Sequence, residues 1–393
     1  MQILTHRPRF PAAALGLALL AACGGGAGPG SPVTTPVTPT GDCAPPPAST
    51  HVVDVRDYGA KGDGVSDDTR AIQGAINAVA GSGGTLRFPA GTYPVNPVAA
   101  GSYGLVVQGA MSLSLDTGAV LQAIPNGAPN SCVLAVSGAS QVTIVGGAIV
   151  GDRAAHTGSS GEWGMGLSID ASSQVVVQGL AVSECWGDGF YISGGSRAVT
   201  LCGVTADHNR RNGLSIVAAQ GVLVTGSTFR NTAGTAPEAG IDCEPNPGAT
   251  VDSVQVTGCT LSGNHGGGFG GGPAVALLGQ AWFTRSTISN CTVSGNNLLG
   301  IEIAASDGNA VVGNLVTGTA GDGIVLTGQA TDTAVTGNTC SGNTGNGISL
   351  DQCAGSVVSG NACTGNGGYG IDVVSGCGAT VSGNTLSDNG RGS

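Results

Sequence analysis

The stretch "DGIVLTGQATDTAVTGNTCSGNTGNGISL" (residues 322–350) contains two copies of one short pattern. In each copy, "DGIVL" and "NGISL", a Gly precedes alternating apolar residues, as in a strand that begins after a Gly turn. The two glycines, Gly323 and Gly347, are 24 residues apart, and nothing between them has helical periodicity. The repeating element is therefore a short strand, and helices between the strands are excluded.

The same pattern recurs along most of the chain. Its glycines are Gly166, Gly189, Gly213, Gly240, Gly300, Gly323, Gly347 and Gly370. The steps between them are 23, 24, 27, 60, 23, 24 and 23 residues. We interpret the step of 60 as two coils, with "PAVAL" (273–277) as a degenerate middle copy. A period of this length with roughly three strands per turn predicts an all-β fold, a parallel β-solenoid.

A second column of residues supports this register. Asn314, Asn338 and Asn361 each lie nine residues before their own Gly, and Cys340 and Cys363 each lie seven before theirs. In a solenoid such residues stack at about 4.8 Å per coil. We expect inward Asn side chains that hydrogen-bond along the ladder, and stacked cysteines that are buried thiols more often than a disulfide.

The N-terminal residues have the features of an export signal. Arg7 and Arg9 precede the apolar run 11–22, which is too short to span a bilayer. The run ends in "LAAC" (20–23), which resembles the cleavage box of bacterial lipoproteins and implies that Cys23 carries lipid. An ordinary signal peptide cleaved nearby is the alternative. The resemblance implies a protein of the bacterial cell envelope that is anchored to a membrane through its N-terminal lipid only.

A Pro-, Thr- and Gly-rich segment follows the signal. Residues 24–50 lack apolar periodicity, so we predict a disordered tether there and a single folded domain over 51–393.

Composition excludes several classes of partner. The 393 residues include 72 Gly, carry a net charge of −11 and contain one lysine, Lys61. Nucleic acid binding is therefore not expected. The twelve cysteines form no C-x-x-C pair, which argues against a zinc site, and they suit an exported protein. We expect a monomer without cofactor or metal; calcium is not predicted.

The segment 52–93 is expected to cover the open first coil. Ile72, Ile76 and Val79 form an apolar stripe at helical spacing, so we predict a capping helix near 67–80. Ser66, Asp67 and Asp68 offer N-caps.

A family resemblance becomes specific at this point. The stretches "DYGAKGDGVSDDTRAIQGAI" (57–76) and "GGTLRFPAGTY" (83–93) resemble the N-terminal segment of pectin-lyase-like proteins, in the branch of rhamnogalacturonase-, polygalacturonase- and epimerase-like enzymes. This resemblance implies a single right-handed parallel β-helix over 51–393 and activity on carbohydrate. It does not name a reaction.

The stretch "GIDCEP" (240–245) holds the leading catalytic candidates. Positions +1 and +3 after each Gly are apolar and should face the core, so +2 and +4 should face outward. Asp242 and Glu244 would then share an outer face, with Cα atoms roughly 6.6 Å apart. Tyr191 would lie two coils to one side and Glu302 two coils to the other. We expect the acid pair to lie on an exposed, concave part of one sheet.

Residues 151–245 concentrate charge around this pair, with 14 of the 37 charged residues of the chain. Weaker catalytic candidates in neighbouring turns are Glu162, Asp188 and Asp207. Residues expected to contact the substrate are Trp163, Trp186, Tyr191, His208, Arg210 and Arg211. Trp163, Trp186 and Arg210 each lie three residues before their Gly, where an exposed column could stack a sugar ring.

The family's reaction-specific motifs do not appear in this region. There is no Asn-Thr-Asp, paired Asp-Asp, Gly-His-Gly or Arg-Ile-Lys, and Tyr191-Ile192-Ser193 stands where alginate epimerases carry Asp-Pro-His. The leading hypothesis is a glycoside hydrolase, because two carboxyls with different pKa values can act as acid and base.

Two other functions stay open. One is a polysaccharide lyase or C5-epimerase acting on a uronate, with Arg210, Arg211, Tyr191 and His208 as the available cation and base. The other is a solenoid that binds glycan without cleaving it.

Overall fold

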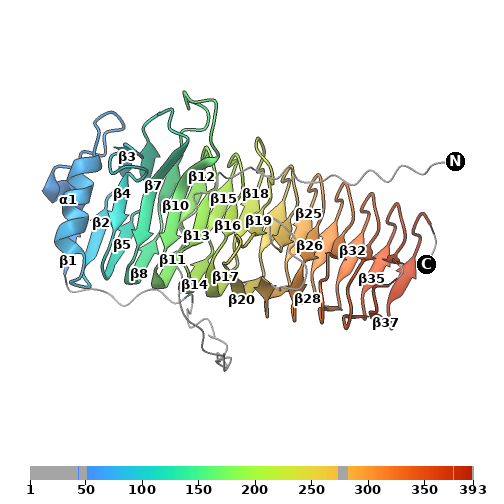
Figure 1. Ribbon diagram of the computed structural model, residues 1–393. Helices are drawn as coiled ribbons and strands as arrows, with labels where there is room; N and C mark the ends of the chain where they lie inside the picture. Colours follow the sequence, from blue (N-terminus) through green and yellow to red (C-terminus); the bar gives the residue numbers. More distant parts are fainter. Residues whose placement is uncertain (1–42, 44–50, 273–281, 375, 392–393) are drawn as a thin grey trace, which may run out of the picture.

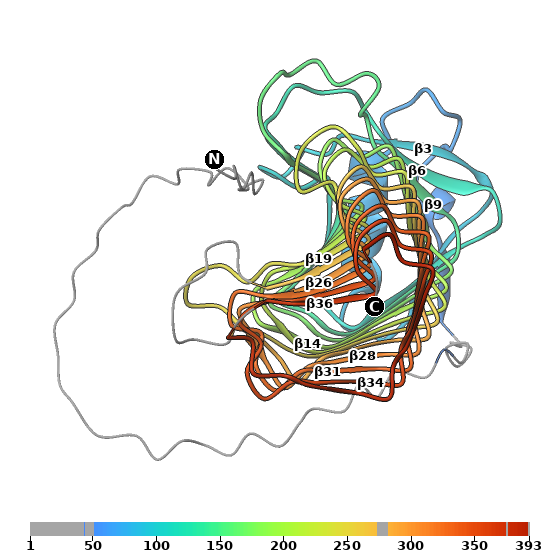
Figure 2. The ribbon, with the colours of Figure 1, turned by 90° about the vertical axis from the view of Figure 1, so that its right-hand side faces the viewer.

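The computed structural model describes Cys43 and residues 51–272, 282–374 and 376–391. The chain winds into a right-handed parallel β-helix with three sheets, as predicted (Figure 1). Sheet 1 has 15 strands and runs from β1 (Val52–Asp54) to β37 (Thr380–Ser382). Sheet 2 has 12 strands, from β3 (Gly91–Val95) to β38 (Thr385–Ser387). The end-on view in Figure 2 shows the three sheets around one continuous interior.

Sheet 3 contains the Gly-anchored strands and carries the candidate site. Its 11 strands run from β4 (Leu105–Val107) to β36 (Ile371–Val373). Its central strands are β10 (Trp163–Asp170), β13 (Phe190–Ser193), β16 (Leu214–Ile216) and β19 (Ile241–Cys243). They pair in the predicted register, with Ser168 opposite Tyr191, Tyr191 opposite Ser215, and Ser215 opposite Asp242.

The predicted middle copy of the 60-residue step is wrong. Within sheet 3, the strand next to β19 is β22 (Phe269–Gly271), so Gly270 lies between Asp242 and Glu302. The segment "PAVAL" (273–277) lies outside the described residues. Its apolar alternation resembled a strand, but the Gly-rich "FGG" makes the backbone hydrogen bonds of this coil.

The interior ladders are confirmed. The side-chain oxygen of Asn338 accepts from the backbone N–H of Asn314 at 2.9 Å, and Asn361 accepts from Asn338 at 2.9 Å. Each Asn thus satisfies backbone groups that a coil turn would otherwise leave buried and unpaired. Cys340 lies opposite Cys363, and both are buried free thiols.

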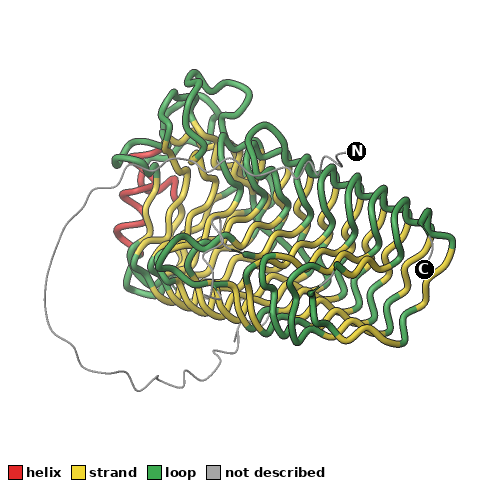
Figure 3. Tube along the Cα trace, turned by 45° about the vertical axis from the view of Figure 1, so that its right-hand side comes forward, coloured by secondary structure: helices red, strands yellow, loops and turns green. Residues whose placement is uncertain are grey.

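The first coil is covered by α1 (Thr69–Val79), drawn in red in Figure 3. Ile72, Ile76 and Val79 are fully buried, which confirms the predicted stripe. Asp67 accepts the N–H of Thr69, while Asp68 accepts the N–H groups of the loop that precedes the helix rather than those of the helix. These acids are therefore cap and turn residues.

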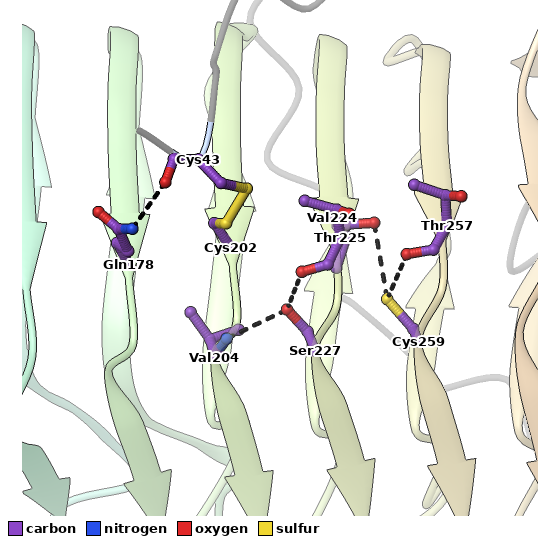
Figure 4. The surroundings of a disulfide bond; sticks show 9 residues. All are labelled: Cys43, Gln178, Cys202, Val204, Val224, Thr225, Ser227, Thr257 and Cys259. Carbon is purple, nitrogen blue, oxygen red and sulfur yellow. Dashed lines mark hydrogen bonds between the residues drawn. A yellow bond between two sulfur atoms is a disulfide. The ribbon is translucent and has the colours of Figure 1, made fainter. Parts of the chain in front are cut away.

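One residue of the expected tether is attached to the β-helix. Cys43 forms a disulfide with Cys202, and the side chain of Gln178 donates to the carbonyl of Cys43 at 2.8 Å (Figure 4). The expectation of a tether without structure is therefore corrected at Cys43. Cys23 lies outside the described residues, and no helix in the described part of the chain is long and apolar enough to cross a membrane.

Candidate functional site

Arg211 lies at the centre of a group of carboxylates on the outer face of sheet 3. Its Nη1 is 3.1 Å from Asp188, its Nη2 is 3.3 Å from Glu244, and its Nε is 3.8 Å from Glu162. The Arg211 side chain is only 11% exposed. Three carboxylates therefore share one nearly buried guanidinium, which raises the pKa of Arg211 further above its usual value despite burial.

Arg211 reaches this position because it stands in a column of glycines. Two residues before the anchor Gly, the other described coils place Gly164, Gly187, Gly266, Gly321, Gly345 and Gly368, with Glu238 and Leu298 as further exceptions. The Arg211 backbone N–H donates to the Gly187 carbonyl at 3.1 Å, so the position is in the ladder. An arginine where the repeat has glycine is the sequence signal that identifies the centre of the cluster.

The acid pair is less exposed than predicted. Asp242 is 8% exposed, and its Oδ2 accepts a hydrogen bond from the Asn212 side chain at 3.2 Å. Burial and the neighbouring Glu244 raise the pKa of Asp242 well above its ordinary value. The expectation of an open strand face is wrong at Asp242, which is buried and bonded to the Asn212 side chain.

Glu244 lies just beyond the end of β19 and remains partly exposed. Burial raises the pKa of Glu244, and the hydrogen-bonded Arg211 opposes this shift. Asp242 is more buried and has no bond to the guanidinium. Within this pair, we therefore assign the proton to Asp242 and the charge to Glu244.

Of the weaker candidates, Asp188 is fully buried and Glu162 is partly exposed. Asp188 accepts the backbone N–H of Asn212 at 3.0 Å as well as the Arg211 side chain. Burial raises the pKa of Asp188, and Arg211 opposes the shift. Asp188 can therefore orient Arg211 and Asn212 but does not face solvent.

Trp186 is not an exposed platform for a sugar. The His156 ring stacks on it at 4.0 Å between centroids, and the Arg210 guanidinium lies 3.9 Å from the ring centre. Arg210 also donates to the Gly161 carbonyl at 3.0 Å. These three side chains fasten the loop 151–162, which brings Glu162 to Arg211. Trp186 and Arg210 are thus engaged in packing, and their role in substrate binding stays a prediction.

Two aromatic residues remain near the cluster. Trp163 is the first residue of β10, not a turn residue, and is 37% exposed. Tyr191 is half-buried against Cys132, Ala135 and Met165, and burial raises its pKa to about 12. Trp163 can therefore stack against a sugar, whereas Tyr191 is poorly suited to act as a base.

The structure does not bring His208 and Asp207 into the cluster. Both lie at the end of β15 (Thr205–Asp207) in sheet 2, where His208 pairs with Asp207 at 2.7 Å. Asp207 also pairs with Arg230 at 2.9 Å. Within the described residues, none of these contacts reaches Arg211.

The cluster offers acid–base chemistry rather than a metal site. Among the described residues, no group of three or more His, Cys, Asp and Glu side chains could hold a metal ion. A protonated carboxyl beside an ionised one is the arrangement that glycoside hydrolysis uses. The groups suggested for uronate chemistry fit less well, since Arg210 and Arg211 are engaged and the pKa of Tyr191 is raised.

Two protein families match the chain. The family described as "Right handed beta helix region" matches residues 98–270 and 249–386. The family described as "Rhamnogalacturonase A/epimerase, pectate lyase-like" matches residues 52–129. The first match extends over most of the chain.

One curated protein is similar to part of the chain in sequence, and two solved structures are similar in fold. The uncharacterized protein YclG of Bacillus subtilis is 27% identical over 241 residues, which are 54% of this chain and 41% of YclG. The A-module of mannuronan C-5 epimerase AlgE6 from Azotobacter vinelandii has a TM-score of 0.66 at 20% identity, covering 85% of this chain and 98% of the module. An exopolygalacturonase from Thermotoga maritima has a TM-score of 0.62 at 12% identity, covering 82% and 92%. At these identities the two solved structures show the fold alone.

Proposed function

Because the chain belongs to the pectin-lyase-like family of right-handed β-helix proteins, we propose that it is an exported polysaccharide-active enzyme that hydrolyses glycosidic bonds. The observation that carries the proposal is the pair formed by buried Asp242 and partly exposed Glu244, beside the engaged cation Arg211. The match of residues 52–129 to the family described as "Rhamnogalacturonase A/epimerase, pectate lyase-like" supports a polysaccharide as the class of substrate.

In the proposed reaction, Asp242 gives its proton to the oxygen of the leaving sugar. Its raised pKa keeps it protonated when ordinary carboxyls are ionised. Glu244, which accepts a hydrogen bond from Arg211, either takes a proton from the attacking water or attacks the sugar itself. Arg211 and Asn212 are positioning residues, because they bond to Glu244 and Asp242 respectively, and Asp188 holds both of them in place.

The test is to incubate the full chain with a panel of polysaccharides. New reducing ends without the ultraviolet absorbance of an unsaturated sugar support hydrolysis. Absorbance of an unsaturated product supports elimination, and a changed uronate configuration without cleavage supports epimerisation. Binding without any product supports a glycan-binding β-helix. Each of the last three results contradicts the proposal.

The attachment to a membrane is a separate proposal that rests on "LAAC" (20–23). Lipid on Cys23 would place the enzyme at the bacterial cell envelope, with the polysaccharide as its main partner. The variant Cys23→Ala should move the protein from the membrane fraction to the soluble fraction. Unchanged fractionation would contradict the anchor.

A further inference from the structure

Beside the acid pair, sheet 3 has a position without a side chain. Gly270 pairs with Asp242 on one side and with Glu302 on the other. Adjacent strands lie about 4.8 Å apart, so the Cα atoms of Asp242 and Glu302 are roughly 9.6 Å apart across the glycine. Every other described coil from β10 to β36 has a side chain at this column position. The outer face of sheet 3 therefore has a gap at Gly270, between the acidic residues Asp242 and Glu302.

One oxygen of Asp242 points at this gap. A Cβ on Gly270 would lie 3.4 Å from Oδ1 of Asp242, and no other contact within 4 Å would meet it. The other oxygen, Oδ2, accepts from Asn212, whereas Oδ1 accepts no hydrogen bond from the described residues. A carboxyl that is more than nine-tenths buried thus keeps one free oxygen aimed over Gly270.

Glu302 lies on the neighbouring strand, on the other side of Gly270 from Asp242. It is half-buried and forms no hydrogen bond or ion pair with any described residue. Burial raises the pKa of Glu302, and no described cation opposes the shift. A half-buried carboxyl without a described protein partner, beside a position that has no side chain, is available to bond a ligand.

We propose that Asp242 and Glu302, which flank Gly270 on the two neighbouring strands, form a subsite for an uncharged sugar residue. This inference rests on the proposed function and adds its substrate class. The hydroxyl groups of a sugar can bond to both carboxyls at once, and the missing side chain of Gly270 leaves room for the ring.

The charges around the gap exclude a uronate from this subsite. Glu244 and Glu302 are acidic, Asp242 carries the proton of its pair with Glu244, and the nearest cation, Arg211, is engaged by Asp188, Glu162 and Glu244. The carboxylate of a uronate would lie near the acids Glu244 and Glu302 without a free counter-ion, which is unfavourable in a partly buried site. A neutral sugar avoids this repulsion.

The experiment compares binding of paired polysaccharides that differ only in charge. Each uronate polymer of the panel, such as polygalacturonate, is paired with its carboxyl-reduced form, and the dissociation constants for the full chain are measured by calorimetry. In pairs that bind, we expect the reduced member to bind at least about tenfold more tightly. A uronate polymer that binds as tightly as its reduced form, or no binding of any reduced member, would overturn the proposal.

Variants at two residues, Glu302 and Gly270, test the position of the subsite. Glu302→Gln should weaken binding of the neutral polymer by about tenfold or more, because one acceptor becomes a donor. Gly270→Leu should abolish binding by filling the gap, and Gly270→Ala should weaken it less. Asp372→Asn, in the same column but three coils beyond Glu302, is the matched control and should bind as the wild type does. Melting temperatures show whether each variant is folded.

The outcomes separate this proposal from the proposed function. Neutral polymers that bind through Gly270 and Glu302 but yield no reducing ends would contradict hydrolysis and support the subsite. Hydrolysis that persists at full rate and affinity in both Glu302→Gln and Gly270→Leu would support the enzyme and overturn the subsite.

Discussion

Two parts of sheet 3 repeat the same polar network in different surroundings. The first network consists of Asp188, Asn212, Ser215 and Asp242, and the second of Asp322, Asn346, Ser349 and Asp372. In each, the first Asp accepts the backbone N–H of the Asn, at 3.0 Å and 2.6 Å. In each, the Asn side chain donates to the Ser hydroxyl at 3.0 Å and to the second Asp, at 3.2 Å and 3.3 Å.

The two networks differ in what surrounds them. Where the first network has Arg211, the second has Gly345. A Cβ atom at this position would lie too close to the Asp322 side chain. Where the first has Glu244, the second has Val374. Asp322 and Asp372 stay partly exposed, whereas Asp188 and Asp242 are buried.

The comparison separates what the coil requires from what is special to the site. An Asp at either position is part of the recurring hydrogen-bond ladder and does not by itself indicate catalysis. Arg211, Glu162 and Glu244 have no counterpart in the second network. They account for the charge and the burial of the first network. Matched substitutions in the two networks therefore measure the site against the same scaffold.

The largest expected difference is in activity. On a polysaccharide that the wild type cleaves, Asp242→Asn or Glu244→Gln should lower kcat by about 10²- to 10⁴-fold, because each removes an acid–base group. Asp372→Asn loses the same carboxyl from the second network and should keep the wild-type rate. Equal activity of Asp242→Asn and Asp372→Asn would show that Asp242 is only a ladder residue.

The next largest effect concerns stability at Arg211. Arg211→Met should lower the free energy of unfolding by about 3–5 kcal/mol, because it leaves buried Asp188 and its neighbours without their cation. Urea denaturation measures the change. Arg197→Met, at an exposed arginine of sheet 1, is the control and should change the free energy by less than about 0.5 kcal/mol. If the two variants unfold at the same urea concentration, Arg211 does not stabilise the cluster.

A smaller contrast is expected between the first Asp of each network. Asp188→Asn should cost about 1.5–3 kcal/mol, since its amide group would face the Arg211 guanidinium with a donor in place of an acceptor. Asp322→Asn should cost only about 0.5–1.5 kcal/mol, because its partners are a backbone N–H and the Ser349 hydroxyl, which can also accept. Thermal unfolding of both variants checks the order, and a larger loss at Asp322 would contradict it.

The smallest effect is the pH dependence at Asp242. Because its pKa is raised in the folded state, the folded chain binds more protons there than the unfolded chain. Stability therefore falls as the pH rises from the ordinary pKa of Asp through the folded value. Asp242→Asn lacks this loss, so its melting temperature relative to wild type should increase from about pH 4 to about pH 8. A difference that shrinks over this range would contradict the raised pKa.

Much of the fold was predictable because a solenoid repeats one local rule. The Gly-anchored strands, their inward apolar residues and the Asn ladder follow from spacing alone, and all lie where predicted. The prediction failed at the 60-residue step, where "PAVAL" resembled a strand more than "FGG" did. Hydrogen bonding by backbone groups, which does not require apolar side chains, decided the register there.

The site was predictable only in part. The outward direction of Asp242 follows from the period-two alternation of a strand, and the sequence pointed to Arg211 as a nearby residue. The burial of Asp242 does not follow from the sequence, because it depends on Arg211, Asn212 and Ser215 from the preceding coil and turn. The roles of Trp186 and Arg210 likewise depend on the loop 151–162, whose path no repeat describes.

The sequence by itself therefore determined the β-helix, its register over most coils and the face on which the acids lie. These properties come from short-range periodicity, and each coil repeats them. Only the tertiary structure decided that Asp188, Glu162 and Glu244 meet on Arg211, and that Gly270 separates Asp242 from Glu302. Such contacts join residues 23 to 49 positions apart, through side chains whose directions depend on packing between coils and loops.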